Sequence, residues 1–450
     1  MNRRNFIKTA SAGVVASSIM DMGQVLANTQ VDSNEYRALV CVFLFGGMDN
    51  HDTIIPYDAQ SYNKWASIRQ SLLNQYVTKR EISALLPITT PSRFGSRQFA
   101  LPPEMPSIAG LYQQGKLSVV GNVGPLLENV NATSIRNETA NLPSRLFSHN
   151  DQQSTWMSGK AEGAQYGWAG KFYDALINQG SAKSNTFSAV TTAGGELLLT
   201  GTNTTPYHVT DGKAATIQAL EFFEGNDAVD AHFSALGHQT NNLLEQDLAS
   251  KIGQSFEANK MFNQAISSQT TSVGEFPKTG LGRQLESVAR TLAVREQLGT
   301  NRQIFVVSMG GFDTHSGQAQ SLPKLQSALD GALGAFNSAM ESMGLSNNVT
   351  LFTASDFGRT LAINGDGTDH GWGAHHFVMG GAINGGTIFG DIPPAELNHE
   401  LDAGSGRLIP TMSVDQYGAA LGQWLGISDS ELAQVFPNLN NFGASPALFA

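Results

Sequence analysis

Three segments of the chain share one pattern: a continuous apolar run, then glycine or a polar turn, then an aspartate. The segments are RALVCVFLFGGMDNHD, which reaches Asp49, RQIFVVSMGGFDTH, which reaches Asp313, and NNVTLFTASDFGRT, which reaches Asp356. Such runs are typical of strands buried on both faces, as in a parallel sheet. Helical periodicity precedes the last two, in GRQLESVARTLAVREQLG and LPKLQSALDGALGAFNSAMESMG. This alternation predicts an α/β fold with a mostly parallel sheet.

Other segments complete a single predicted domain from residue 35 to 450. KLSVVGNVG is a further candidate strand, and the polar helical pattern of about 214–268 predicts an insertion that covers this domain. ITTPSRFGSRQFALPPEMP has the composition of a loop. NGGTIFGDIPP suggests a strand pair, and SVDQYGAALGQWLGISDSELAQVF predicts a helix near the end. We find no internal repeat and no linker, which favours one domain.

Composition narrows the classes of partner. The 450 residues are 41% hydrophobic and 14% charged, with a formal net charge of −11. Basic runs are absent from the sequence, so a nucleic acid or an anionic membrane surface is not expected as a partner. The lone Cys41 excludes an internal disulfide and lies in an apolar run, where we expect it to be buried.

The first residues have the features of a twin-arginine signal peptide. Arg3 and Arg4 precede a short, mildly apolar run, and VLANTQ offers a processing site near Ala27. The run is too short to span a bilayer, so we expect a signal peptide over residues 1–27 and no membrane span in the mature chain. The export machinery is therefore an expected partner, and the location is periplasmic or secreted. This pathway exports folded proteins, which favours a bound metal or cofactor.

The strand-end aspartates and a histidine-rich segment predict a metal site. Ligands of open α/β sheets collect at the carboxyl ends of the strands, where the three aspartates should meet. TDHGWGAHHFVMGG adds His370, His375 and His376, in a stretch too rich in glycine for a helix. Carboxylates and imidazoles suit zinc, manganese or iron. Each aspartate taken alone could instead cap the following turn or helix.

These residues resemble those of the alkaline phosphatase and sulfatase superfamily. Over nearly the whole chain, the closer resemblance is to an exported bacterial domain-of-unknown-function family, number 1501, grouped with that superfamily. The segments that carry it are FLFGGMDNHDTIIPY, LFSHNDQQSTWMSG, GWAGKF, GGFDTH, SDFGRT, DHGWGAHHFVMGG and PTMSVDQYGAALGQWLG. The resemblance implies an alkaline-phosphatase-like three-layer sandwich, with helices on both faces of the sheet.

The resemblance also implies roles for the candidate ligands. Asp49 would bridge two divalent metals, Asp313 and His315 would bind one of them, and Asp356 would bind the other. His370, His375 and His376 would supply the remaining imidazole, either as three ligands or as one ligand with neighbours that orient it or hydrogen-bond the loop. Zinc is the first choice of metal, with manganese, iron and calcium as alternatives.

One departure from the superfamily pattern affects the metal count. Where phosphatases commonly have a histidine after the later aspartate, this chain has Phe357. The second metal would then lack a ligand unless His149 or His51 replaces it. A single ion is the alternative.

Three further residues are candidates for catalysis. Ser148 precedes a predicted helix, where it could be the nucleophile or only the N-cap. His149 could act beside it or bind metal. Arg359 could clamp a phosphate or sulfate, or could form a salt bridge that holds the loop.

The function indicated by these residues is an exported metal-dependent hydrolase of phosphate or sulfate esters, with a small molecule or a glycan carrying the ester. Two alternatives remain open. One is a periplasmic metal-binding or assembly protein that keeps the fold without turnover, and the other is a structural envelope protein that binds no metal. Fold alone does not decide among them.

Overall fold

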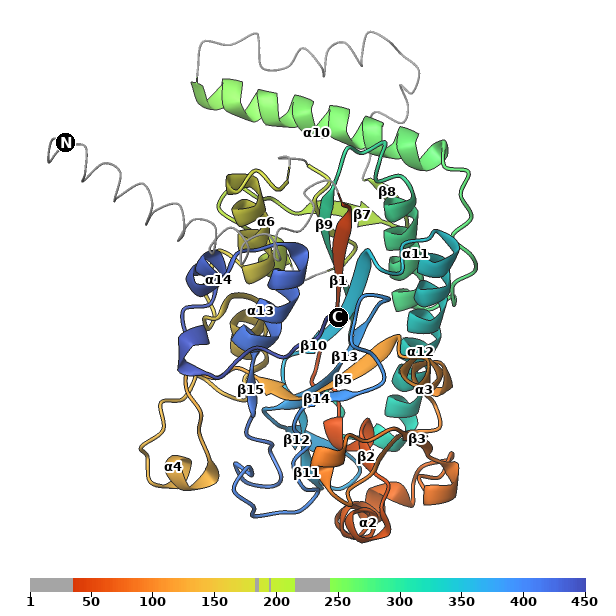
Figure 1. Cartoon of the computed structure of the whole chain (residues 1–450), viewed down its shortest axis with the longest axis vertical. Coiled ribbons are helices and arrows are strands. Elements are labelled where there is room, and N and C mark those ends of the chain that lie inside the picture. Colours follow the sequence, from red (N-terminus) through yellow and green to blue (C-terminus); the bar gives the residue numbers. More distant parts are fainter. Residues whose placement is uncertain (1–34, 183–185, 194–195, 215–242) are drawn as a thin grey trace, which may run out of the picture. The chain divides into compact units, whose positions relative to one another are not determined.

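The computed structural model describes residues 35–182, 186–193, 196–214 and 243–450 (Figure 1). The predicted signal peptide, residues 1–27, lies outside the described residues, and so does the predicted insertion up to residue 242. Residues 37–450 cluster as one unit. None of the described helices combines the length and the apolar character that crossing a membrane requires.

The largest sheet within the described residues has ten strands and is mostly parallel, as predicted. Its order is β14-β5-β13-β10-β1-β9-β6-β7-β8, and β15 also pairs with β5. The β10–β13, β13–β5 and β7–β8 pairs are antiparallel. The strands are β1 (Arg37–Leu44), β5 (Leu117–Gly124), β6 (Ala189–Thr191), β7 (Tyr207–Thr210), β8 (Lys213–Ala214), β9 (Arg302–Met309), β10 (Val349–Ser355), β13 (Ala374–Met379), β14 (Ile388–Gly390) and β15 (Met412–Ser413).

Helices cover both faces of this sheet. Figure 1 shows α3, α11 and α12 on one side and α6, α13 and α14 on the other. The described helices are α2 (Ala59–Leu73), α3 (Pro106–Gln113), α4 (Ala132–Arg136), α5 (His149–Ser158), α6 (Trp168–Asn178), α7 (Glu196–Leu199), α10 (Leu243–Ser267), α11 (Gly280–Ala293), α12 (Gln318–Ser342), α13 (Val414–Leu425) and α14 (Asp429–Val435). The fold is therefore the α/β class that the apolar runs predicted.

The apolar runs are buried on both faces because each face meets helices. In β1, Leu39, Cys41 and Phe43 pack in a core with residues of α5, α6 and α13, while Val40 and Val42 on the opposite face are also fully buried. Burying apolar side chains of this size contributes roughly 1.5–3 kcal/mol each. Cys41 is a buried thiol, as predicted, and burial raises its pKa far above the ordinary value.

The loop predicted between residues 88 and 106 is partly wrong. Phe99–Leu101 forms β4 of a small antiparallel sheet with β2 (Ile55–Pro56) and β3 (Leu86–Ile88). Strands this short leave no alternation to read, and Pro87 hides one of them. The predicted strand pair after residue 381 is a single strand, β14, which pairs with β5.

Candidate metal centre

Three strand ends meet at one edge of the sheet. Strand β1 lies between β9 and β10 and is parallel to both, and Leu44 is paired with Met309 on one side and Ser355 on the other. The residues that follow the three strands therefore emerge level with one another. Strand β13 runs antiparallel to β10, so the short strand β12 (Thr368–His370), which precedes it and ends at His370, arrives at this edge as well.

Asp313 lies at the centre of a group of histidines. Its Oδ1 is 3.1 Å from Nε2 of both His315 and His370, and its Oδ2 is 3.4 Å from Nε2 of His149. Nη1 of Arg359 donates to Oδ1 over 2.6 Å. Burial opposes ionisation, but the hydrogen bond and charge of Arg359 outweigh it and lower the pKa of Asp313. The group is therefore a carboxylate facing three imidazoles.

Each of these imidazoles is oriented by a hydrogen bond at its other nitrogen. Nδ1 of His149 lies 2.6 Å from Oδ2 of Asp356, and Nδ1 of His370 lies 2.8 Å from the Phe147 carbonyl oxygen. Nδ1 of His315 lies 3.2 Å from Oδ1 of Asp369. Because carbonyl and carboxylate oxygens only accept, each Nδ1 carries the proton of the neutral ring. Each Nε2 then has a lone pair directed into the group.

This arrangement fits a divalent cation. Nε2 of His315 and Nε2 of His370 are 2.9 Å apart, so two lone pairs face each other beside a carboxylate. A bound cation would relieve that repulsion. Histidines that bind metal ions commonly donate their other ring N–H to a carboxylate or carbonyl oxygen, as these three do. Ligands 2.0–2.2 Å from one zinc ion can be at most about 4.4 Å apart, and the separations from Asp313 lie within that limit. His149, Asp313 and His370 together satisfy the geometry of a possible metal site.

Asp356 accepts the hydrogen bond that orients His149. It is fully buried, and besides His149 it accepts hydrogen bonds from Nε2 of Gln153 at 2.8 Å and from the Gly46 N–H at 3.0 Å. The hydrogen bond to Asp356 raises the pKa of His149. From the sequence, His149 is a candidate to replace the missing ligand beside Asp356. In the structure it contacts Asp356 directly, through a hydrogen bond of its Nδ1.

Phe357 packs against the centre. Its ring centroid lies 4.8 Å from that of His149 and 4.6 Å from that of His370. Burial lowers the pKa of His370, which favours the neutral ring that binds metal. The residue that departs from the superfamily pattern therefore forms an apolar wall for two of the imidazoles.

Ser148 occupies the N-cap position of α5, but its side chain makes no cap hydrogen bond to the helix backbone. Its hydroxyl donates to Oδ2 of Asp151 at 2.8 Å. Phe147, one residue before, has a left-handed backbone with φ 72° and presents its carbonyl to His370. The turn before α5 thus places Ser148 between the Phe147 carbonyl, which contacts His370, and His149.

Asp49 lies apart from the imidazoles. Arg69 pairs with it at 2.6 Å in a fully buried ion pair, and Gln318 donates to the same carboxylate at 2.6 Å. Burial alone would raise the pKa of Asp49, but Arg69 holds it below the ordinary value. Nε2 of the nearby His51 lies 3.1 Å from the Gly406 carbonyl oxygen. Because a carbonyl oxygen only accepts, Nε2 is the donor of this hydrogen bond. The structure does not bring Asp49 into hydrogen-bond contact with Asp313 or its histidines.

His375 and His376 also lie away from the centre. Nδ1 of His375 accepts the Asn122 N–H at 2.9 Å, and burial lowers its pKa well below the ordinary range. His376 packs between Trp156 and Tyr417, and burial lowers its pKa to about 3. Only His370 of the histidine-rich segment joins Asp313, which corresponds to the alternative of one ligand with neighbours.

Arg359 adopts the salt-bridge arrangement rather than facing solvent. It is fully buried, and besides Asp313 it donates to the Gly46 carbonyl at 3.1 Å and to Oγ1 of Thr368 at 3.2 Å. Its guanidinium holds the loop that carries Asp313. Its guanidinium is therefore enclosed by these partners and is not exposed to solvent.

Some contributors had no sequence signal. Asp369 and the Phe147 carbonyl orient imidazoles, and Arg69 and Gln318 neutralise Asp49. Asp369 stands next to His370, so its polarity could have marked it. The Phe147 carbonyl is a backbone group that its residue type does not reveal. Arg69 and Gln318 come from segments with no pattern of their own, and only the folded chain brings them to the strand ends.

Gly46 offers a test of how tightly the centre is built. Its φ is +111°, and an added Cβ would lie 2.4 Å from the Asp313 backbone nitrogen. We expect Gly46→Ala to lower the free energy of unfolding by at least about 1–3 kcal/mol and to weaken zinc binding, because Asp313 must shift. Gly115→Ala is the control, since Gly115 also has positive φ but faces open space. Equal effects in denaturant titrations of both variants would contradict this packing.

A family model described as "Protein of unknown function (DUF1501)" matches residues 36–405. A search of curated proteins found no match.

Solved structures similar to this chain include enzymes of the alkaline phosphatase and sulfatase kind. The lipoteichoic acid synthase LtaP from Listeria monocytogenes is 10% identical, with 92% of this chain and 77% of that chain covered and a TM-score of 0.34. The PsFucS1 sulfatase from Pseudoalteromonas sp. is 8% identical, with 96% and 76% covered and a TM-score of 0.38. The alkaline phosphatase of the Antarctic bacterium TAB5 is 10% identical, with 90% and 99% covered and a TM-score of 0.27.

Proposed function

Because the chain belongs to the family described as "Protein of unknown function (DUF1501)", which assigns no activity, we propose its function from the site: a metal-dependent hydrolase of phosphate or sulfate esters. The single observation that carries the proposal is the convergence of three oriented Nε2 atoms on the Asp313 carboxylate. Such a set has little structural purpose without a cation, because its lone pairs repel.

His149, His315 and His370, together with Asp313, would hold the ion. The ion is proposed to be zinc, which binds imidazole and carboxylate, with manganese, iron or calcium as alternatives. One ion rather than two is supported by the ion pair of Asp49 with Arg69, which occupies the carboxylate assigned to the bridge. When bound, a divalent cation supplies positive charge at the ester oxygens and activates a nearby hydroxyl or water.

The chain's own residues would handle the nucleophile and its proton. Ser148 lies between Phe147, which contacts His370, and His149, and its hydroxyl already donates to Asp151. Asp151 would accept the hydroxyl proton as Ser148 Oγ bonds to the phosphorus or sulfur and the alcohol of the ester leaves. Water would then release the phosphate or sulfate from Ser148. The amino end of α5 would favour the negative charge of the ester. Arg359 would act by holding Asp313 in place.

We further propose that the protein is exported by the twin-arginine pathway and acts in the periplasm or outside the cell. The paired Arg3 and Arg4 and the short apolar run after them support this. A small molecule or a glycan would carry the ester. Preventing cleavage near Ala27 or replacing both arginines with lysine, followed by cell fractionation, tests the proposal.

A metal-binding protein without turnover is the second candidate. It is favoured by the buried Arg359, which leaves the described centre without an open cationic clamp. This candidate predicts bound zinc and no ester hydrolysis. A structural envelope protein would bind no metal.

Metal analysis combined with activity separates these candidates. We expect the purified mature protein to contain about one zinc per chain and to hydrolyse aryl phosphates or aryl sulfates. Removing the metal with a chelator should reduce the rate to below about 1%, and adding zinc should restore it. Ser148→Ala tests the nucleophile, with Ser154→Ala on the same helix as the control. No hydrolysis of either ester class by the zinc-loaded protein would overturn the proposed function.

A further inference from the structure

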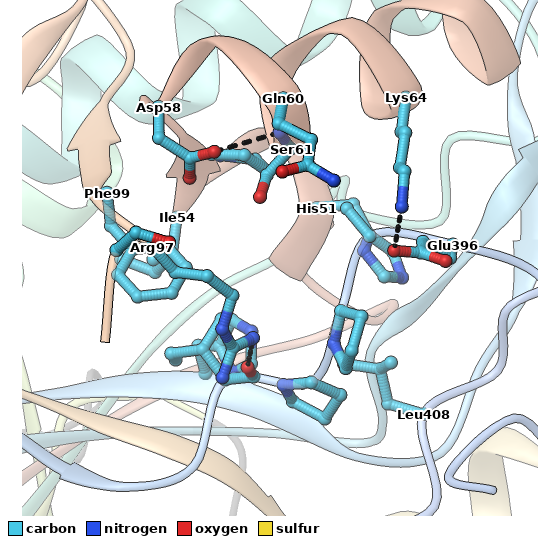
Figure 2. Close-up of a pocket in the computed structure, with 17 residues that line it drawn as sticks. His51, Ile54, Asp58, Gln60, Ser61, Lys64, Arg97, Phe99, Glu396 and Leu408 are labelled. Atoms are coloured by element: carbon cyan, nitrogen blue, oxygen red, sulfur yellow. Dashed lines mark hydrogen bonds and ion pairs between the residues drawn. The ribbon is translucent and has the colours of Figure 1, made fainter. Parts of the chain in front are cut away.

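A cavity built from residues other than the proposed metal ligands lies beside helix α2. Its volume is about 170 Å³, well above the roughly 10–15 Å³ that by this measure admits one water molecule. None of the four proposed metal ligands lines it. In Figure 2, Gln60, Ser61 and Lys64 lie along α2 on one side, with His51 and Leu408 on the other.

Two of the lining residues are buried histidines, and each keeps one ring nitrogen for which the described residues supply no hydrogen bond. Nε2 of His51 donates to the Gly406 carbonyl, which leaves Nδ1 as an acceptor with no partner among the described residues. Nδ1 of His375 accepts from the Asn122 N–H, which leaves its Nε2–H as a donor. Both rings line the cavity and are 6% and 3% exposed. A ligand must therefore offer both donors and acceptors.

The charged side chains around the cavity already have ion-pair or hydrogen-bond partners. Lys64 forms an ion pair with Glu396 at 2.6 Å, as Figure 2 shows, and Arg97 lies 3.6 Å from Asp391. Both carboxylate oxygens of Asp58 accept backbone N–H groups. The groups left to bind a ligand are uncharged, which disfavours a phosphate or sulfate here.

The remaining walls are apolar or carry hydroxyl and amide groups. Phe99, Ile392, Pro393 and Pro394 form the apolar part, and Gln60 and Ser61 add polar groups. Phe99 adds one phenyl ring to the two imidazoles of the lining. Apolar walls with a few convergent polar groups are typical of small-molecule sites.

We propose that this cavity is a second ligand site, which binds an uncharged, hydroxyl-rich ring such as a single sugar unit. Its hydroxyls would donate to His51 and accept from His375, and one face of the ring would lie on the apolar wall. The proposal does not depend on the proposed ester hydrolysis. It adds a recognition site to the same chain, next to the loop that carries Arg407, whose guanidinium donates to the His370 carbonyl.

The test uses methyl glycosides of glucose, galactose and mannose with the mature protein, observed by saturation-transfer NMR and titration. We expect at least one glycoside to bind, and Ser61→Trp and Ser96→Trp to weaken it about 10-fold or more by filling the cavity from two sides. Ser71→Trp, at an exposed position of the same helix, is the control and should change affinity less than about 2-fold. Circular dichroism checks that each variant is folded.

Three outcomes would overturn the proposal. One is that no glycoside binds to the wild-type protein. A second is that inorganic sulfate or uridine, rather than a glycoside, binds in a manner sensitive to Ser61→Trp. The third is that glycoside binding is lost in metal-free His315→Ala protein, which would assign the sugar to the metal centre. Binding that persists there, whatever the esterase assays give, supports a separate site.

Discussion

Asp356→Asn should weaken zinc binding by about 10–100-fold while the protein stays folded. The carboxylate accepts from Gly46 N–H on one oxygen and from His149 and Gln153 on the other. If the asparagine oxygen keeps the Gly46 bond, its NH₂ group faces two donors. His149 must then move its proton to Nε2 or rotate, and in either case the lone pair leaves the centre. Competition with a chromophoric chelator measures the affinity.

Asp369→Asn provides the matched control for this substitution. Asp369 orients His315 in the same way, but its side chain is 47% exposed and the contact is longer, at 3.2 Å. Solvent can replace it there, so we expect a smaller loss of zinc affinity, below about 10-fold. Equal affinities for wild type and Asp356→Asn would show that His149 is not a ligand.

Arg69→Met should lower the free energy of unfolding by about 3–5 kcal/mol. The substitution keeps much of the buried volume but leaves the Asp49 carboxylate without its cation, and Gln318 cannot replace that charge. Guanidinium titration measures the change. Arg290→Met is the control, because Arg290 pairs with Glu286 on an exposed helix face and should cost less than about 1 kcal/mol. Similar losses in both variants would contradict a structural role for the Asp49 pair.

The same pair has a pH signature. Arg69 holds the pKa of Asp49 below its ordinary value of 3.8, although burial opposes this. The unfolded chain therefore binds the proton more readily, so the stability from this pair is present above the unfolded pKa and is lost as the pH falls through the folded pKa. Wild type should lose this contribution only in acid below about pH 4. In Arg69→Met it should already be absent at neutral pH.

The central strands could be predicted because each is a long apolar run that ends abruptly in glycine or aspartate. The helices before β9 and β10 were predicted for a similar reason, their clear periodicity. The strands β2, β3 and β4 are two or three residues long and pair through contacts that no local pattern records. Tertiary pairing, not propensity, forms that small sheet.

The candidate site was predictable to the extent that topology decides it. Parallel strands with level ends bring Asp313 and Asp356 to one edge, and the reversal into β13 brings His370 there. The partners of each side chain were not predictable. Asp49 has the same sequence setting as Asp313, yet Arg69 from α2 neutralises it. His375 and His376 lie on a strand, where successive side chains point to opposite faces.

The left-handed turn at Phe147 has a consequence for alanine scanning. A bulky residue with φ 72° is held there by its surroundings, and the bond from His370 to its carbonyl is one of those restraints. Truncating His370 removes an imidazole and also releases the peptide that precedes Ser148 and His149. The phenotype of that single change would thus combine the loss of the imidazole with the displacement of Ser148 and His149, and it should not be interpreted as the contribution of one side chain.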